Sequence, residues 1–163
     1  MKKALVLMIS LMLAVFLPSC KKEGFVDSAS CEQIGKAIET TVNDEQEYLC
    51  HDETHLALYF DKDEYDDSYS AYSASTTDIS EFGVFHAPNE RTADELYDEV
   101  CDYVSDMKEE ERAFIASCAP NELTKLDAAR VKRFGNYVVY TVLDKDTANE
   151  VLKKVEELVL QEQ

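Results

Sequence analysis

Tyr137-Val138-Val139-Tyr140-Thr141-Val142-Leu143 is composed almost entirely of β-branched and aromatic residues, the composition of a buried strand. The dipeptide Gly135-Asn136 precedes it, and a glycine at the first turn position suits a type II′ turn. Residues 130–134 are therefore predicted to pair with residues 137–143 as a β-hairpin. The second arm is expected to lie centrally in a sheet, because it is almost wholly made of strand-forming residues.

Two more strands are expected before this hairpin. Residues 81–87, which Pro88-Asn89 closes, form one of them. Residues 65–75, rich in Tyr and Ser, are predicted to form an edge strand. Residues 55–60 fit either a strand or the end of a helix, because periodicity does not decide so short a run.

Three helices are predicted from their capping residues and their apolar period. Ser-x-x-Gln at residues 30–33 opens the first, and Thr-x-x-Glu at residues 92–95 opens the second. The apolar spacing extends the second helix to Cys118, ahead of the helix-breaking Pro120. The third opens at residues 146–150, where Asp146/Thr147 precede Glu150, and continues to the end of the apolar pattern.

The element order is therefore α-β-β-α-β-β-α. It predicts an antiparallel sheet of about four strands packed with helices, in the α+β class, formed by a single domain over residues 30–163. No internal repeat of useful period is present.

Three motifs carry a resemblance to a known family. They are Glu81-Phe82-Gly83-Val84-Phe85 ahead of an acidic helix, Pro120-x-Glu122-Leu123 after it, and Gly135-Asn136-Tyr137-Val138-Val139. Their arrangement resembles an uncharacterised bacterial lipoprotein family, domain of unknown function 4358, over roughly residues 65–160. The resemblance implies a lipid-anchored extracytoplasmic domain of α+β fold. It implies no activity, substrate or catalytic residue.

The first twenty residues read as a targeting signal. Lys2 and Lys3 precede an apolar run over residues 4–17, which is shorter than the roughly 20 residues that a membrane span needs. Leu17-Pro18-Ser19-Cys20 resembles the lipobox of bacterial lipoproteins, which implies diacylglyceryl transfer to the Cys20 thiol and cleavage before it. The alternative is an ordinary secretory signal cleaved at the same bond. Residues 1–19 are thus predicted to be a signal peptide and residues 20–29 a membrane-proximal tether, on the extracytoplasmic face of the cell membrane.

The charge balance excludes several function classes. The chain has 34 acidic and 16 basic residues, a net charge of −18, and loss of the two lysines before Cys20 makes it −20. Such a surface repels phosphate backbones and anionic headgroups, so a nucleic-acid partner is not expected and the only membrane contact expected is the lipid anchor. Nine Tyr and seven Phe argue against disorder.

Four cysteines follow Cys20: Cys31, Cys50, Cys101 and Cys118. An even number outside the cytoplasm permits two disulfides. Cys101, however, falls on the apolar stripe of the second helix, and Cys101 and Cys118 would lie about 25 Å apart along one helix. Free, buried thiols are the expectation, with pairing as the alternative.

His51-Asp52-Glu53-Thr54-His55 is the first candidate for a metal site. On a helix, His51 and His55 would share one face, as the two ligands of a zinc hydrolase do. The general-base position, however, holds Asp52 instead of glutamate, and no long apolar helix flanks the motif. A polar loop is the alternative interpretation.

Residues 61–67, Asp-Lys-Asp-Glu-Tyr-Asp-Asp, are the second candidate. They begin like a calcium loop in which Asp61 and Asp63 would be ligands. Asp66 replaces the glycine at the sixth position and Tyr72 replaces the glutamate at the twelfth. The alternative is a solvated acidic turn.

Nucleophilic and cofactor chemistry find little support. A reactive thiolate at Cys50 or Cys101 needs an electropositive neighbourhood, which this acidic chain opposes. With four glycines in all, and no Gly-rich fingerprint, loops that cradle phosphate are not expected. No cofactor and no catalytic residue is predicted.

Tyrosines at residues 65, 69 and 72, close to Tyr59 and Phe60, suggest a recognition surface on the predicted edge strand. The alternative is half-buried strand tyrosines. The leading hypothesis is a non-enzymatic protein- or peptide-binding module whose acidic face selects a basic partner. The alternative hypothesis is a divalent-cation-binding protein, or a metal-dependent hydrolase, that uses His51, His55, Asp61 and Asp63.

Overall fold

Five antiparallel strands form one sheet in the order β1-β2-β3-β5-β4 in the computed structural model, which describes residues 24–43 and 46–160. The strands are β1 (Tyr48–Cys50), β2 (Asp67–Ser73), β3 (Glu81–His86), β4 (Arg130–Phe134) and β5 (Tyr137–Val142). The centre of the sheet is β3, which pairs with β2 on one side and with β5 on the other.

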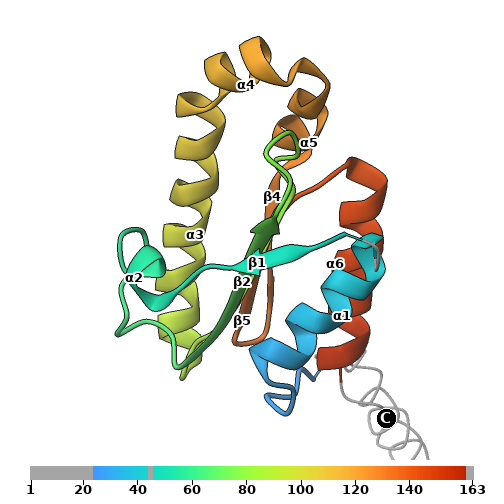
Figure 1. Cartoon of the computed structure of the whole chain (residues 1–163). Helices are drawn as coiled ribbons and strands as arrows, with labels where there is room; N and C mark the ends of the chain where they lie inside the picture. Colours follow the sequence, from blue (N-terminus) through green and yellow to red (C-terminus); the bar gives the residue numbers. More distant parts are fainter. Residues whose placement is uncertain (1–23, 44–45, 161–163) are drawn as a thin grey trace, which may run out of the picture.

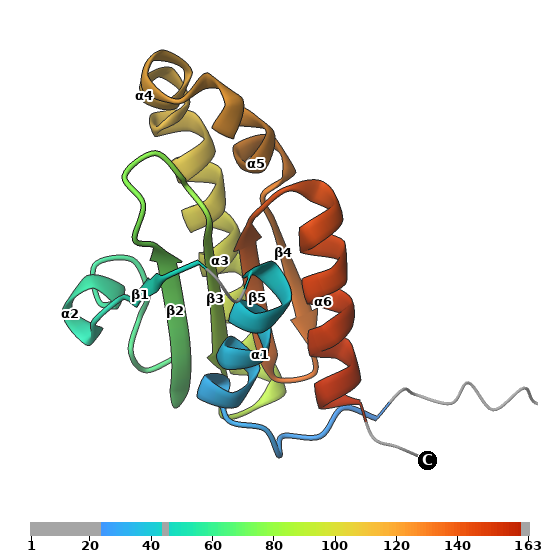
Figure 2. The same cartoon turned by 45° about the vertical axis from the view of Figure 1, so that its right-hand side comes forward.

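Helices cover both faces of the sheet, as Figures 1 and 2 show. They are α1 (Cys31–Asn43), α2 (Glu53–Leu56), α3 (Glu90–Glu110), α4 (Arg112–Cys118), the 3-10 turn η1 (Pro120–Glu122), α5 (Leu123–Ala128) and α6 (Lys145–Val159). Helices α1 and α6 lie side by side on one face, and α3 lies on the other. The described part of the chain contains no helix that is both long enough and apolar enough to cross a bilayer.

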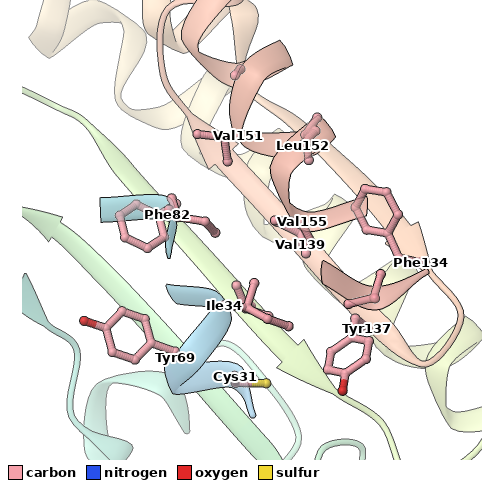
Figure 3. Packing of buried hydrophobic residues seen from close by; sticks show 14 of the residues in the cluster. Cys31, Ile34, Tyr69, Phe82, Phe134, Tyr137, Val139, Val151, Leu152 and Val155 are labelled. Atoms are coloured by element: carbon pink, nitrogen blue, oxygen red, sulfur yellow. The ribbon is translucent and has the colours of Figure 1, made fainter. Parts of the chain in front are cut away.

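The larger core lies between the sheet and the α1/α6 layer (Figure 3). Successive side chains of a strand point to opposite faces, so alternate residues of β2, β3 and β5 supply it. They meet the apolar faces of both helices, whose i, i+3/i+4 spacing presents one continuous stripe. The buried residues at its centre include Ile34, Tyr69, Phe82, Val139, Val151 and Val155.

A second core lies under α3 and has a limited extent. Leu96, Val100 and Val104 of the helix cover the outer pair of strands, β4 and β5. On this face of the sheet, β1 and the C-terminal half of β2 lie toward the edge that is farther from β4 and β5. There α2 and the turns that follow it lie beside β1 (Figure 2). This uneven cover is what leaves room for a cavity.

The predicted α+β class and the hairpin are confirmed. Strand β5 is internal and every one of its residues is buried, and Gly135 has a positive φ of 61° in the turn before it. The strand count was underestimated, because β1 was not predicted. Its three residues are too few to show an alternating pattern, and two of them are exposed.

The prediction that residues 65–75 form an edge strand is wrong. The strand β2 is second in the sheet, and β1 pairs with its C-terminal half, placing Leu49 opposite Tyr72 and Cys50 opposite Ala71. Residues 55–60 are not a strand: His55 and Leu56 end α2, and hydrogen-bonded turns follow as far as Phe60.

The helix boundaries need three corrections. The second helix is not continuous to Cys118, because α3 ends at Glu110 and α4 starts at Arg112. Its N-cap is Asn89, whose side chain accepts a hydrogen bond from the Thr92 amide, so Thr92 lies inside the helix. The last helix begins at Lys145, with Asp144 as its N-cap residue. The capping box predicted at Ser30 and Gln33 is confirmed by reciprocal hydrogen bonds of 3.2 Å and 3.0 Å.

The segment before α1 lies against the domain. Phe25 forms a β-bridge with Leu160 and an edge-to-face contact with Phe134, and the Val26 amide donates to the Val159 carbonyl. Of the ten residues predicted to form a tether, Phe25, Val26, Asp27 and Ala29 therefore contact the folded chain. The predicted signal peptide and its lipid-attachment residue Cys20 lie outside the described residues.

Candidate functional site

A cavity of about 280 Å³ lies on the α3 face of the sheet, beside β1 and β2. Its walls come from α2, the loop before β3, α3 and the α4–α5 region, so segments far apart in the sequence meet there. The lining residues are His51, His55, Tyr59, Tyr72, Ser73, Asp78, Ile79, Ser80, Glu81, Tyr103, Met107, Glu111, Ile115 and Leu126.

Glu81 is the central polar group of this cavity. As the first residue of β3 it shares a face with Gly83, and so points toward α3. Its Oε1 accepts hydrogen bonds from the hydroxyls of Tyr103 and Tyr140, both at 2.7 Å. None of the described residues donates to its other oxygen, Oε2. The carboxylate is therefore held at one oxygen and available at the other.

The hydrogen-bond donors keep Glu81 ionised. Burial alone would raise the pKa of this carboxyl, but contacts from His51, Tyr140 and Tyr103 outweigh it and hold the pKa below its ordinary value. Burial and the nearby Glu81 charge raise the pKa of both tyrosines, so they remain neutral donors. At neutral pH the cavity thus carries a fixed negative charge in a partly desolvated setting.

Aromatic rings form a continuous wall beside this carboxylate. The rings of Tyr72 and His51 lie 4.6 Å apart between centroids, and His51 stacks on His55 at 4.0 Å. His55 contacts Tyr59 at 5.2 Å, and Tyr59 meets Tyr103 edge-to-face at 5.0 Å. Tyr59 and Tyr72 remain 48% and 37% exposed, so the wall reaches from the buried carboxylate to the surface.

His51 has an unusual environment within this wall. Its side chain is only 10% exposed, and its Nε2 lies 3.7 Å from Glu81 Oε1, too far for a hydrogen bond. This buried nitrogen has no hydrogen-bond partner among the described residues. Burial, and then the neighbouring His51, lower the pKa of His55. A buried polar atom without a partner is uncommon and indicates a place where a ligand atom fits.

Two other residues that line the cavity, Asp78 and Ser80, belong to an ionic network. Lys125 donates to Asp78 Oδ1 at 2.7 Å and to Ser80 Oγ at 3.0 Å, and lies 2.9 Å from Glu122 Oε2. Burial alone would raise the pKa of Asp78, but the bonds from Lys125 and Ser80 outweigh it and hold the pKa well below its ordinary value. Asp78 is therefore neutralised within the protein, unlike Glu81.

Replacing Lys125 with methionine is expected to lower the free energy of unfolding by about 1–3 kcal/mol at pH 7, because two carboxylates lose their cation. The depressed pKa of Asp78 stabilises the fold above the ordinary carboxyl pKa, and this contribution is lost as the pH falls. The deficit of the variant should therefore shrink in urea melts at pH 3. Lys153→Met, at a 77% exposed side chain, is the control and should change stability by less than about 0.5 kcal/mol. An equal loss at both pH values would contradict the assignment.

The two histidines predicted as metal ligands do come together, but not as predicted. His51 precedes α2 and is not part of that helix. Asp52 is the N-cap residue of α2, and its side chain accepts a hydrogen bond from the His55 amide at 2.8 Å. Two imidazoles stacked face to face direct their in-plane lone pairs in parallel, not toward one ion. Within residues 24–43 and 46–160, no group of three or more His, Cys, Asp or Glu side chains is arranged to hold a metal ion.

The predicted calcium ligands lie elsewhere. Asp61 Oδ1 accepts from the Asp63 amide at 3.0 Å, and neither residue lines the cavity of the two histidines. Two other carboxylates of the acidic run have structural partners. Asp66 bonds His86 Nδ1 at 2.6 Å, and Asp67 accepts from the Cys31 amide at the start of α1. The structure therefore does not combine Asp61 and Asp63 with His51 and His55.

The tyrosines of β2 separate onto two faces. Tyr69 is buried against α1 and bonds Glu39 and Cys50, whereas Tyr72 lines the cavity. Of the residues predicted to form a recognition surface, Tyr72 and Tyr59 line the cavity, whereas Tyr69 lies on the other face of the sheet. Sequence reasoning missed Glu81 and Tyr103. One sequence signal could have indicated Glu81: it is an acidic residue two positions before Gly83, on the inward face of a buried strand.

The four cysteines within the described residues are unpaired. Cys31 is buried, and burial raises the pKa of its thiol above the ordinary range. Cys101 is only half-buried, and Cys50 and Cys118 are exposed, so the prediction of buried thiols is correct for Cys31 alone. Cys101 lies at the edge of the face that Leu96, Val100 and Val104 bury.

An antiparallel sheet between helices, with one wall of aromatic rings around a fixed carboxylate, defines an α+β domain with a surface cavity. The chain belongs to the family described as domain of unknown function (DUF4358), whose model matches residues 42–143. The matched region contains all five strands and every residue that lines the cavity. Comparisons with curated proteins and with solved structures gave no match.

Proposed function

We propose that this chain is a lipid-anchored extracytoplasmic protein that binds a basic protein or peptide partner, and that the cavity around Glu81 receives a cationic side chain of that partner. One observation carries the proposal: a largely buried, ionised carboxylate, with one oxygen that lacks a donor among the described residues, lies beside a wall of aromatic rings. Aromatic faces attract cations, and the attraction grows as the site is desolvated.

The charges around the cavity support a cationic ligand. Glu81 and Glu111 line it, and no described lysine or arginine pairs with either of them, whereas Asp78 is already paired with Lys125. The overall net charge of −18 would also speed the approach of a basic partner. No described feature of the cavity favours a divalent ion, because its histidines stack and Asp61 and Asp63 lie outside it.

Binding is tested with the chain from Lys21 to Gln163, which contains every described element, and a short acetylated, amidated peptide with one central lysine. Glu81→Gln is expected to weaken binding at least about tenfold, since the glutamine keeps an acceptor for the two tyrosines but removes the charge. Tyr72→Ala is expected to weaken it about two- to tenfold. The measurement is isothermal titration calorimetry at physiological salt.

Non-specific attraction to an acidic protein is the competing explanation. Glu150→Gln removes the same charge from an exposed position on α6, on the other side of the sheet, and should leave the affinity unchanged. Equal effects of Glu81→Gln and Glu150→Gln would contradict a specific site. A rise in the unfolding midpoint with zinc or calcium, removed by a chelator and by His51→Ala, would favour the metal-binding alternative instead.

Lipid attachment is supported by the lipobox-like residues that end at Cys20 and is tested independently. Mass spectrometry of the protein extracted from membranes should show an N-terminal cysteine with a diacylglyceryl adduct. Cys20→Ala should move the protein out of the membrane fraction. An unmodified N-terminus at Cys20 would favour the ordinary secretory signal.

A further inference from the structure

We infer that the cavity around Glu81 selects a primary ammonium group on an alkyl stem, the chemistry of a lysine side chain, over a guanidinium or a quaternary ammonium group. This inference rests on the proposed function of the cavity as the binding site for a basic partner.

The hydrogen bonds of Glu81 exclude the geometry that a guanidinium prefers. A guanidinium binds a carboxylate through two parallel N–H groups, one to each oxygen. Here the hydroxyls of Tyr103 and Tyr140 already occupy Oε1, and only Oε2 lacks a donor among the described residues. Tyr140 is fully buried and also bonds Ser70 at 2.9 Å, so it does not swing away to release Oε1. A ligand that needs one acceptor oxygen therefore fits better than one that needs two.

His51 supplies the second requirement. Its Nε2 is buried, lines the same cavity and has no described partner. When an ammonium group lies against Glu81 in its place, the neutral tautomer of His51 that carries its proton on Nδ1 offers this nitrogen as a hydrogen-bond acceptor. A primary ammonium has three N–H groups and satisfies both Glu81 Oε2 and His51 Nε2. A quaternary ammonium has none, so it would cover Glu81 Oε2 and the buried His51 Nε2 without donating to either, which costs binding.

The remainder of the cavity suits an alkyl stem. Apolar side chains of Ile79, Met107, Ile115 and Leu126 line it together with the aromatic wall. The aliphatic part of a lysine side chain buries apolar area there while its charged end reaches the carboxylate. Tyr59 and Tyr72 are exposed at the surface, where the backbone of a partner protein would lie.

The test compares peptides that differ at a single position. Acetylated, amidated peptides with lysine, arginine, Nε-trimethyl-lysine or norleucine at the centre are titrated into the chain from Lys21 to Gln163. Lysine is expected to bind at least about tenfold more tightly than arginine or trimethyl-lysine, which corresponds to one unmatched buried hydrogen-bonding group. Norleucine is expected to show no binding. Because the unmodified protein is used, no result depends on a variant that folds poorly.

The outcomes separate this inference from the proposed function. Arginine or trimethyl-lysine binding as tightly as lysine would overturn the inference but leave a cation-binding cavity. Absence of binding by every cationic peptide would overturn the proposed function itself. Spermidine binding more tightly than the lysine peptide would overturn the assignment to a protein side chain in favour of a free polyamine.

A variant tests the role of His51. His51→Phe keeps an aromatic ring between His55 and Tyr72 but removes the acceptor. Its near-ultraviolet circular dichroism serves as the control for folding. In this variant the preference for lysine over trimethyl-lysine should fall by at least half, while Glu81→Gln should weaken binding of both. An unchanged preference in a folded His51→Phe protein would overturn the role given to His51.

Discussion

Phe82→Ala is expected to lower the free energy of unfolding by about 3–5 kcal/mol, the cost of removing a large aromatic side chain from a packed core. Phe82 is fully buried in β3, the central strand. Its ring centroid lies 5.4 Å from that of Tyr48 and 6.3 Å from that of Tyr69. Strands β1 and β2 hold these two rings in place, so they do not close the space that alanine leaves.

Urea denaturation followed by circular dichroism measures this effect. The unfolding midpoint should fall while the slope stays the same, because the surface exposed on unfolding hardly changes. Phe114→Ala is the control: that side chain is 66% exposed on α4, and its loss should change stability by less than about 0.5 kcal/mol. Similar losses in the two variants would show that the core is not centred on β3.

Gly83→Ala is expected to cost between about 2 and 5 kcal/mol and also to abolish binding of the lysine peptide. A Cβ at this position would lie 2.1 Å from Cε1 of Tyr140, whose ring crosses β3 where the glycine has no side chain. Overpacking of this kind costs about 1–3 kcal/mol. Displacing the ring also breaks its bonds to Glu81 and Ser70, which adds the cost of a hydrogen bond to a charged group.

A double-mutant cycle isolates the steric cause. Tyr140→Val removes the ring atoms that the new methyl group would meet. In that background the additional cost of Gly83→Ala should fall below about 1 kcal/mol. A cost that is the same with and without the tyrosine ring would contradict the explanation. The glycine would then matter for the backbone alone.

Local composition was sufficient to predict the centre of the fold. Residues 137–143 are so rich in strand-forming side chains that their place inside the sheet followed without tertiary information. The short edge strand β1 was invisible because it depends on pairing with β2. The break between α3 and α4 falls in a run of good helix formers, Lys108 to Arg112, so packing and not propensity sets it. The start of α3 was placed too late, because Asn89, which follows Pro88, caps the helix three residues before the predicted Thr92.

The candidate site was predictable only in pieces. Sequence reasoning named His51, His55, Tyr59 and Tyr72, but their meeting depends on the register that places Leu49 opposite Tyr72. The opposite fates of Tyr69 and Tyr72 follow from the two-residue period of a strand, since residues three apart face opposite sides. Glu81 was overlooked because it is the first residue of a strand whose other inward residues are apolar or glycine.

Methyl NMR of Met107 tests most directly whether the cavity around Glu81 is the binding site. Three of the four methionines precede Cys20, so the chain from Lys21 to Gln163 contains Met107 alone, and that side chain lines the cavity. Labelling its methyl group with carbon-13 gives one resonance that reports on the site. Titration with the lysine peptide should move this resonance saturably in the native protein, and in Glu81→Gln the midpoint of the titration should lie at a peptide concentration at least about tenfold higher. A resonance that stays fixed while calorimetry detects binding, or that moves with the same midpoint in Glu81→Gln, would place the ligand elsewhere and contradict the proposed site.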